Sequence, residues 1–423
     1  MEPRERSATR VGRRLAIATR RPGHQAEAVR WRCKLSRRKR PKDDWFAAAI
    51  VRAMFAYAAV GLVLFVQVAR TEASSILPPD SEIRRLLVQR VDAQKQTVGI
   101  VVGVLEPAGR RVVFYGHPAK NADRPLDGDS VFQIGSVTKV FTSLLLADMV
   151  QHRQVALDDP AAKYLPKGVT MPRRGTSTIT LRHLATHTSG LPRDPLNPSS
   201  SDPDNPYLGY SIDQLYQFLS TYQLTREIGS QYEYSNLGGG LLGHVLARRA
   251  GMDYATLVKS RICDPLGMNS TRATVSPEME MRLVTGHNEN LKAVSPLDLP
   301  VIPGAGCLRS TAADLLAFLA AILGYVKTPL APAISAMLDV RHPTGVPGLE
   351  IALGWHVSTT GHREIVWHNG GLGGCGSFIG YDPKNRLGVV VLSNSETPGV
   401  ADEIGRSLLE RRAFRRQPGQ IGE

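Results

Sequence analysis

Three short polar motifs lie between residues 136 and 370 of this 423-residue chain, and they constrain its fold because they can act together only if the fold brings them to one place. The motifs are Ser136-Val-Thr-Lys139, Tyr234-Ser235-Asn236 and His368-Asn369-Gly370. Each is common when it occurs alone. Together they supply a nucleophile, a base beside it, a second proton carrier and a polar strand edge, which are the parts needed for acyl transfer through a serine ester.

The surroundings of Ser136 distinguish it from other Ser-x-x-Lys sequences, such as residues 36–39 in the basic N-terminal region. An apolar run ending in Gly135 precedes it, and residues 140–150 are apolar on most of a helix circumference. We therefore expect Ser136 at the start of a buried helix, with Lys139 on the same face. Free N–H groups at such an end suit a developing oxyanion. The simpler alternative is a capping serine followed by a solvated lysine.

Lys139 can take a proton from Ser136 only if its pKa is lowered, because an ordinary lysine titrates near pH ~10.4. The apolar helix would provide the necessary burial. Tyr234 is expected on the other side of the serine, where its phenol passes protons to the leaving group, and Asn236 offers an amide to the substrate and the lysine. The alternative for Tyr234 is a half-buried ring with its hydroxyl in water. Residues 237–243 contain four glycines, which indicates close backbone approach, since each glycine in a helix costs about 1 kcal/mol.

The third motif reads as a strand over residues 365–368 whose edge is stripped of side chains by the glycines of residues 369–374. Such an edge can pair with an extended acyl substrate. The N–H of Gly371 would complete an oxyanion hole with that of Ser136. A lone His-x-Gly more often marks a turn with a polar histidine, so the position of His368 before further strands matters. Those strands are expected at 378–381 and 387–392, with a turn at 382–385.

The combined motifs resemble the class C β-lactamase and penicillin-recognising serine hydrolase superfamily, which also contains D-alanyl-D-alanine peptidases, D-amino-acid amidases and esterases. The resemblance covers roughly residues 82–413. It implies that Ser136 is the acylated nucleophile, Lys139 its base partner, Tyr234 the phenol of the second motif and Asn236 its amide. Further segments that carry it are Ile179 to Pro192, Asp264 to Met268 and Gly306 to Asp314.

His368 departs from the class C pattern, because it stands where those enzymes have the lysine of a Lys-Thr-Gly motif. A lysine holds a permanent positive charge for a substrate carboxylate, whereas a histidine is charged only below roughly pH 6.5. Peptidase and amidase members tolerate histidine there. The resemblance therefore favours a D-Ala-type peptidase or a hydrolase of smaller acyl substrates over an efficient β-lactamase. Substrate contacts are expected from Asn236, His368, Asn369, Gly370 and Gly371.

The resemblance implies an α+β fold of the β-lactamase/transpeptidase type, with a mainly antiparallel sheet flanked by helices and a helical lobe. Strands would come from both ends of the chain, at 98–105 and 111–115 early and within 365–394 late. Residues 399–413 read as a closing amphipathic helix, and residues 193–210 as a loop over the cleft. We expect the active site where the sheet and the lobe meet.

The formal net charge of +14 belongs mainly to the N-terminal region. Residues 1–73 contain 17 Lys and Arg against 6 Asp and Glu, a surplus of 11 that leaves only +3 for the rest. The order of residues predicts a basic leader at 1–52, an apolar signal or anchor segment at 53–73 and a hydrolase domain at 74–423. Although basic runs also occur in DNA-binding arms, the near-neutral remainder disfavours a nucleic-acid partner.

The uncharged residues 53–69 are slightly longer than an ordinary signal core and lie at the short end of a membrane span. Basic residues before such a segment stay on the cytoplasmic side. This order predicts a periplasmic or secreted enzyme that residues 53–69 could anchor in the inner membrane. Cleavage of the leader is left open, and its length indicates that translation could begin downstream of Met1.

No disulfide framework, cofactor or metal is expected. Cys33 falls in the leader, which leaves an odd number of cysteines that are best interpreted as buried small residues. His183 and His187 have the spacing of helix-borne metal ligands, but no third ligand accompanies them. The remaining cysteines are Cys263, Cys307 and Cys375.

The predicted function is that of an exported serine hydrolase that cleaves amide bonds of β-lactams or D-Ala peptides, with a small molecule or a peptidoglycan peptide as substrate. Two alternatives remain open. An esterase would prefer short acyl esters and ignore D-Ala peptides. A catalytically idle penicillin-binding sensor or scaffold would show acylation without turnover. The intact set of Ser136, Lys139, Tyr234 and Asn236 argues against it, because a scaffold has no need of all four.

Overall fold

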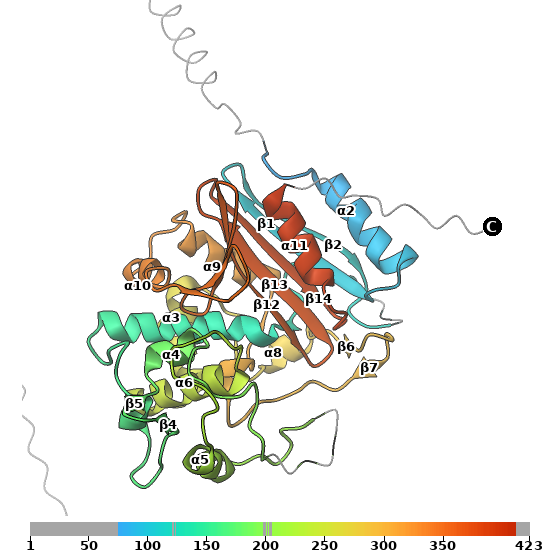
Figure 1. Cartoon of the computed structure of the whole chain (residues 1–423). Coiled ribbons are helices and arrows are strands. Elements are labelled where there is room, and N and C mark those ends of the chain that lie inside the picture. Colours follow the sequence, from blue (N-terminus) through green and yellow to red (C-terminus); the bar gives the residue numbers. More distant parts are fainter. Residues whose placement is uncertain are drawn as a thin grey trace, which may run out of the picture. The chain divides into compact units, whose positions relative to one another are not determined.

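The computed structural model describes residues 75–411, apart from 121, 123, 198, 199, 201, 203 and 204 (Figure 1). The basic leader predicted at 1–52 and the apolar segment predicted at 53–73 lie outside the described residues. Within residues 75–411, and with those gaps, no helix is long and apolar enough to cross a membrane.

The centre of the fold is an eight-stranded antiparallel sheet with the strand order β2-β1-β14-β13-β12-β11-β10-β9. Segments from both ends of the chain meet in it, because Ile100 of β1 lies opposite Ser393 of β14. The strands are β1 (Gly99–Glu106), β2 (Gly109–Gly116), β9 (His342–Pro343), β10 (Leu349–Ile351), β11 (His356–Thr360), β12 (Arg363–Leu372), β13 (Cys375–Asp382) and β14 (Leu387–Ser393). The predicted α+β fold class is confirmed.

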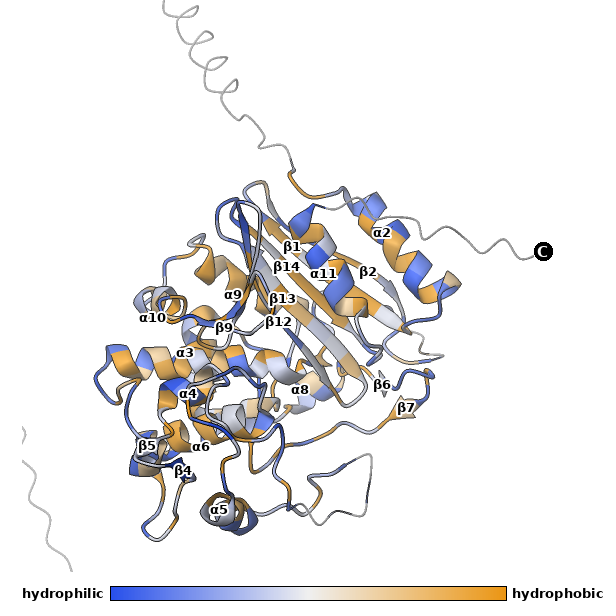
Figure 2. Cartoon of the chain, in the orientation of Figure 1, coloured by the Kyte–Doolittle hydropathy of each residue, from blue (hydrophilic) through white to orange (hydrophobic). Residues whose placement is uncertain are grey.

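Both faces of the sheet are covered. Side chains alternate along β1, so Ile100 and Val102 pack with one hydrophobic core while Val101 packs with the other. The first core lies under α2 (Asp80–Val88) and α11 (Val400–Glu410), which lie across the same face of the sheet in Figure 1, and hydrophobic and hydrophilic residues alternate along both helices in Figure 2. The closing helix predicted at 399–413 is therefore observed as α11.

The second face of the sheet joins a helical lobe. Its central helix, α3 (Thr138–Gln151), is buried over most of its length, and Phe141 stacks on Phe318 of α9 (Ala312–Ile322) with 4.6 Å between ring centroids. The other α-helices are α4 (Leu181–Ala185), α5 (Ile212–Thr221), α6 (Asn236–Ala250), α7 (Tyr254–Val258), α8 (Pro277–Glu280) and α10 (Ala331–Ala336). The described residues also form three two-stranded ribbons: β3 (Phe132–Gln133) with β8 (Arg309–Ser310), β4 (Arg173–Arg174) with β5 (Ser177–Thr178), and β6 (Gly286–His287) with β7 (Ala293–Val294).

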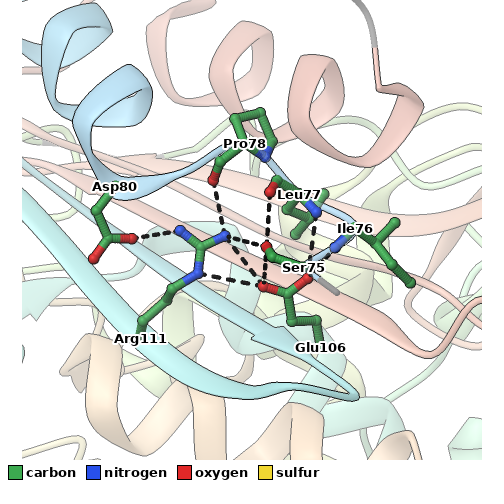
Figure 3. Close-up of polar contacts among 7 residues, drawn as sticks. All are labelled: Ser75, Ile76, Leu77, Pro78, Asp80, Glu106 and Arg111. Atoms are coloured by element: carbon green, nitrogen blue, oxygen red, sulfur yellow. Dashed lines mark hydrogen bonds and ion pairs between the residues drawn. The ribbon is translucent and has the colours of Figure 1, made fainter. Parts of the chain in front are cut away.

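A buried carboxylate at the end of β1 fastens the first described residues to the sheet (Figure 3). Glu106 is 3% exposed and accepts hydrogen bonds from the Ser75 hydroxyl at 2.8 Å and from the N–H groups of residues 76–77 at 2.7 and 3.3 Å. The guanidinium of Arg111 donates to the same carboxylate at 3.2 Å and also pairs with Asp80. Both carboxylate oxygens of Glu106 therefore accept at least one hydrogen bond.

Candidate active site

Ser136 and Lys139 are placed by a tight turn that runs into α3. Ser136 lies in the one-turn helix η2 (Gly135–Val137), and Lys139 follows in the first turn of α3. Gly135 has a φ of +48°, and a Cβ there would lie 2.9 Å from the backbone of Gly371, so the turn requires glycine. The Nζ of Lys139 lies 3.0 Å from the Oγ of Ser136. The two groups are close enough for direct proton transfer.

The ammonium group of Lys139 is held by acceptors that carry no charge. Its side chain is 2% exposed, and Nζ donates to the Oδ1 of Asn236 at 2.9 Å and to the carbonyl oxygen of Ala305 at 2.7 Å. Burial, helped by the nearby Arg193 cation and opposed by Asp194, lowers the pKa of Lys139 to about 7. Two N–H bonds thus point at carbonyl oxygens that can only accept. In the neutral amine the remaining lone pair faces the Ser136 hydroxyl, as a general base requires.

Tyr234 lies beside both Ser136 and Lys139. Its phenol hydrogen-bonds with Ser136, and the Nζ of Lys139 lies 4.9 Å from the centroid of its ring. Burial raises the pKa of the Tyr234 phenol above its ordinary value, and the Ser136 contact offsets only part of that rise. The group therefore stays protonated at neutral pH and can donate a proton, while a phenolate is disfavoured.

The loop that carries Tyr234 is held by hydrogen bonds to residues 179–192, one of the segments that carry the family resemblance. The N–H of Ser235 donates to the Nδ1 of His187 at 3.1 Å, and the Ser235 hydroxyl donates to the carbonyl of Pro192 at 2.6 Å. The ring of His187 lies 4.5 Å from that of Tyr234. His187 thus supports the tyrosine, and no group of three potential metal ligands occurs among the described residues.

Asn236 is oriented by Asp194, a carboxylate that the sequence analysis did not identify as part of the site. Its Nδ2 donates to the Oδ1 of Asp194 at 3.0 Å, and the hydroxyl of Tyr207 donates to the same oxygen at 2.5 Å. This pairing directs the Oδ1 of Asn236 toward Lys139. Asp194 and Tyr207 belong to the loop predicted over the cleft at 193–210. The only sequence signal for a role in the site was that this loop directly follows residues 179–192.

The glycines that follow Asn236 allow the lysine to be enclosed. A Cβ on Gly239 would lie 3.0 Å from the Cε of Lys139, and a Cβ on Gly240 would lie 2.3 Å from Ile302. A Cβ on Gly243 would lie 2.8 Å from the backbone of Gly304. Close backbone approach, predicted from the glycine content, is what the structure contains at the start of α6.

The third motif supplies an unpaired strand edge beside the nucleophile. β11 pairs with β12 only as far as His356 opposite Trp367, so residues 368–372 are paired on the β13 side alone. A Cβ on Gly370 would lie 2.8 Å from the backbone nitrogen of Ser136. The missing side chain therefore lets the strand approach η2. A cavity of about 90 Å³ opens here, and its wall includes Ser136, Asn236, Arg193, Tyr207 and Gly371.

His368 is neutral in this position. It is fully buried, and its Nδ1 lies 2.6 Å from the carbonyl oxygen of Asn369, which can only accept, so Nδ1 carries the proton. Burial, together with nearby His356 and Lys139, lowers the pKa of His368 well below its ordinary value. The imidazole therefore cannot replace the permanent charge of a lysine.

Asn369 contributes no side chain to the cleft. Neighbouring residues of a strand point to opposite faces, and the Nδ2 of Asn369 donates to the Oδ2 of Asp402 in α11 at 2.7 Å. Only the backbone of Asn369 is left for substrate contacts.

The three described cysteines are buried free thiols, and burial raises the pKa of each to about 12.

Behind His368 lies a layer of aromatic side chains that sequence reasoning missed. The ring of His356 lies 5.3 Å from that of His368, and its Nε2 is 3.1 Å from the hydroxyl of Tyr232. Burial, together with the Arg406 cation, lowers the pKa of His356 to about 4. This side of the site is therefore uncharged at neutral pH.

Comparisons with known proteins identify the family of the chain. A family model described as Beta-lactamase matches residues 83–412. The D-alanyl-D-alanine-carboxypeptidase/endopeptidase AmpH of Escherichia coli (strain K12) is 31% identical over 310 residues, which cover 70% of this chain and 78% of that protein.

Solved structures share the fold. A class C beta lactamase from Rhodobacter sphaeroides superposes with a TM-score of 0.67 at 25% identity, covering 78% of this chain and 98% of the other. A beta-lactamase/D-alanine carboxypeptidase from Yersinia pestis gives a TM-score of 0.67 at 26% identity over the same shares of the two chains. The chain belongs to the beta-lactamase family and is a serine hydrolase of that type.

Proposed function

We propose that this enzyme hydrolyses amide bonds next to D-alanine through an acyl-enzyme on Ser136. The observation that carries the proposal is the arrangement at Lys139, whose two carbonyl acceptors, the Oδ1 of Asn236 and the backbone oxygen of Ala305, leave its lone pair directed at the serine hydroxyl. A lysine whose pKa is about 7 is half deprotonated at neutral pH, which is suited to a general base. A merely structural lysine would not need this enclosure.

In the first half-reaction the Oγ of Ser136 attacks the substrate carbonyl carbon while its proton passes to Lys139. The N–H groups of Ser136 and Gly371 are proposed to stabilise the oxyanion. The carbon–nitrogen bond then breaks as Tyr234 gives its proton to the leaving nitrogen and regains one from Lys139. In the second half, a water oxygen attacks the ester carbon while its proton passes to Lys139. The bond between that carbon and the Oγ of Ser136 then breaks, the proton returns to Oγ, and the acyl group leaves as a carboxylic acid.

A D-Ala peptide is preferred as substrate over a β-lactam, because the neutral His368 stands where the class C motif has a lysine. The relative that is 31% identical is named as a D-alanyl-D-alanine carboxypeptidase and endopeptidase, while the E. coli beta-lactamase is 25% identical. The free edge of β12 is proposed to pair with the acyl part of the peptide.

The test is intact-mass spectrometry and product analysis after incubation with a peptide ending in D-Ala-D-Ala, with penicillin, and with a short acyl ester. We expect release of D-alanine and a slowly hydrolysed penicillin adduct on Ser136, both lost in Ser136→Ala. Rapid penicillin turnover without peptide cleavage would identify a β-lactamase instead. Ester cleavage alone would identify an esterase, and an adduct without any turnover would identify a sensor.

We also propose that the enzyme acts outside the inner membrane. The support is the order of the N-terminal sequence, in which basic residues precede the uncharged residues 53–69. Cell fractionation of the full chain, followed by N-terminal sequencing, tests this proposal. Recovery of an uncleaved enzyme in the cytosol would contradict it.

A further inference from the structure

One cation on the wall of the catalytic cavity has no part in the proton transfers described above. Arg193 is the single charged side chain among the described residues that border the cavity. Its side chain is 67% exposed, and its guanidinium carbon lies 5.2 Å from the centroid of the Tyr234 ring. The carbonyl of Arg193 accepts hydrogen bonds from the N–H groups of Asn236 and Leu237 at 2.7 and 3.0 Å. The backbone that presents this cation is thus fixed to the catalytic motif.

The guanidinium of Arg193 is weakly engaged. The nearest carboxylate oxygen is the Oδ2 of Asp194 at 3.8 Å, which is an ion-pair distance but too long for a hydrogen bond. The other oxygen of Asp194 is already used by Asn236 and Tyr207. None of the described residues forms a hydrogen bond with the N–H groups of this guanidinium, and a planar guanidinium beside a cavity is well suited to bind a second carboxylate.

The other basic groups at the site cannot perform this task. His368 is neutral and fully buried, with its Nδ1 proton directed at a carbonyl. Lys139 is enclosed, and its Nζ is already shared among Ser136, Asn236 and Ala305. A substrate carboxylate that enters the cavity therefore meets one available positive charge.

The position of Arg193 also specifies which side of the scissile bond it serves. The guanidinium lies over the ring of Tyr234, the group that protonates the leaving nitrogen under the proposed function. A D-Ala-D-Ala peptide carries its free carboxylate on that leaving residue. Resting on the proposed function, we propose that Arg193 binds the substrate's terminal carboxylate and so selects peptides with a free C-terminus, a task for which the class C motif uses a lysine.

The experiment compares N-acetyl-L-lysyl-D-alanyl-D-alanine with the same peptide ending in a carboxamide, using the whole enzyme. We expect kcat/KM to be roughly 10- to 100-fold higher for the free acid, chiefly through KM. Arg193→Met should remove this preference, and Arg193→Lys should retain part of it. Arg174→Met, which removes an exposed arginine paired with Glu227, serves as the matched control and should keep the preference.

The ratio of the two peptides separates recognition from a structural role. Arg193 also helps to lower the pKa of Lys139, but that effect acts equally on both peptides and cancels in the ratio. If Arg193→Met slowed both peptides equally, or if the wild-type enzyme cleaved both at one rate, the inference would be wrong while the proposed peptidase function stood. If the wild type cleaved neither peptide, both would be wrong.

Discussion

Glu106 and Lys139 are two of the charged side chains that are almost fully enclosed in the described part of the chain, and their surroundings differ in one respect. Glu106 at the end of β1 is 3% exposed and receives hydrogen bonds from a hydroxyl, two backbone N–H groups and the Arg111 guanidinium. Lys139 is 2% exposed and contacts two carbonyl oxygens and a hydroxyl, none of which is charged. The carboxylate of Glu106 therefore contacts an oppositely charged partner, whereas the ammonium group of Lys139 contacts only neutral acceptors among the described residues.

The two pKa shifts show what the difference achieves. Burial raises the pKa of Glu106, but the hydrogen bonds from Ser75 and residues 76–77 and the charge of Arg111 outweigh it, so the net pKa is lowered and the carboxylate is favoured. Burial lowers the pKa of Lys139 to about 7, so the charged form is disfavoured. A buried group in contact with an opposite charge keeps its charged form, whereas a buried lysine that contacts only neutral acceptors loses its proton more readily.

The largest expected effect is on catalysis at Lys139. Lys139→Met should lower kcat/KM by about 10³-fold or more, because it removes the proposed general base while nearly keeping the volume of the side chain. The same change should raise the free energy of unfolding at pH 6 by about 1 to 3 kcal/mol, because it removes a disfavoured buried cation.

The stability gain from Lys139→Met should depend on pH in a defined direction. The folded pKa is lowered, so the unfolded chain binds more protons between about pH 7 and the ordinary lysine value, and wild-type stability rises with pH in that window. The advantage of the variant should shrink there. Urea unfolding at several pH values measures it, with exposed Lys292→Met as the control, and a destabilised variant at pH 6 would contradict the account.

The second effect is on stability at Glu106. Glu106→Gln should lower the free energy of unfolding by about 2 to 4 kcal/mol at pH 7, because it leaves the Arg111 guanidinium without its buried partner. The pKa of Glu106 is lowered in the folded state, so the contribution is complete above its ordinary value of 4.5 and is lost as pH falls through the folded value.

Activity per folded molecule should be unchanged in Glu106→Gln, because the carboxylate lies outside the cleft. The matched control is Glu403→Gln, which removes a 59% exposed carboxylate paired with Arg90 and should change stability by less than about 1 kcal/mol. Equal losses in the two variants would show that the buried pairing of Glu106 has no special weight.

The smallest expected effect concerns Asp402 in α11, a partly buried carboxyl outside the cleft. Burial raises the pKa of this carboxyl to about 6, partly offset by the hydrogen bond from Asn369. Above about pH 6 the carboxyl is ionised in the folded protein, where burial destabilises its charged form. Asp402→Asn should therefore raise the melting temperature by roughly 1–3 °C at pH 7.5, and the gain should fade as pH falls from about 6 toward the ordinary value of 3.8.

The Asp402 variant also tests the placement of the third motif. The side chain of Asn369 points to α11 and away from the cleft, so kcat/KM should stay within about twofold of the wild type. A large loss of activity would show that Asn369 acts on substrate through its side chain. It would also show that a destabilised charge outside the cleft, such as Asp402, affects catalysis as well as stability.

Sequence patterns predicted the elements that depend on local rules. The apolar run after Ser136 predicted a buried helix, the glycines of 237–243 predicted close packing, and those of 369–374 predicted an open strand edge. The orientation of Asn369 was predictable from strand alternation, but motif reasoning overlooked it. The helix also begins later than expected, at Thr138 after a tighter turn.

Other features of the site depend on contacts between distant segments that no local pattern encodes. Asp194 and Tyr207 orient Asn236 from a polar loop, and His356 reaches His368 from the neighbouring strand. The neutral state of His368 likewise depends on three-dimensional burial. Sequence could name the replacement of a lysine by this histidine, but it could not decide the charge.

The central claim is that the neutral contacts of Lys139 make it the base for Ser136. Its most direct test is the pH dependence of Ser136 acylation by penicillin, monitored from pH 5.5 to 9 by stopped-flow and intact-mass measurements. If the uncharged surroundings of Lys139 make it the base, the acylation rate should rise with an apparent pKa of about 7, and the rise should vanish in Lys139→Met. A rate that is flat across this range, or one that keeps rising to pH 9 with no inflection near 7, would contradict the account.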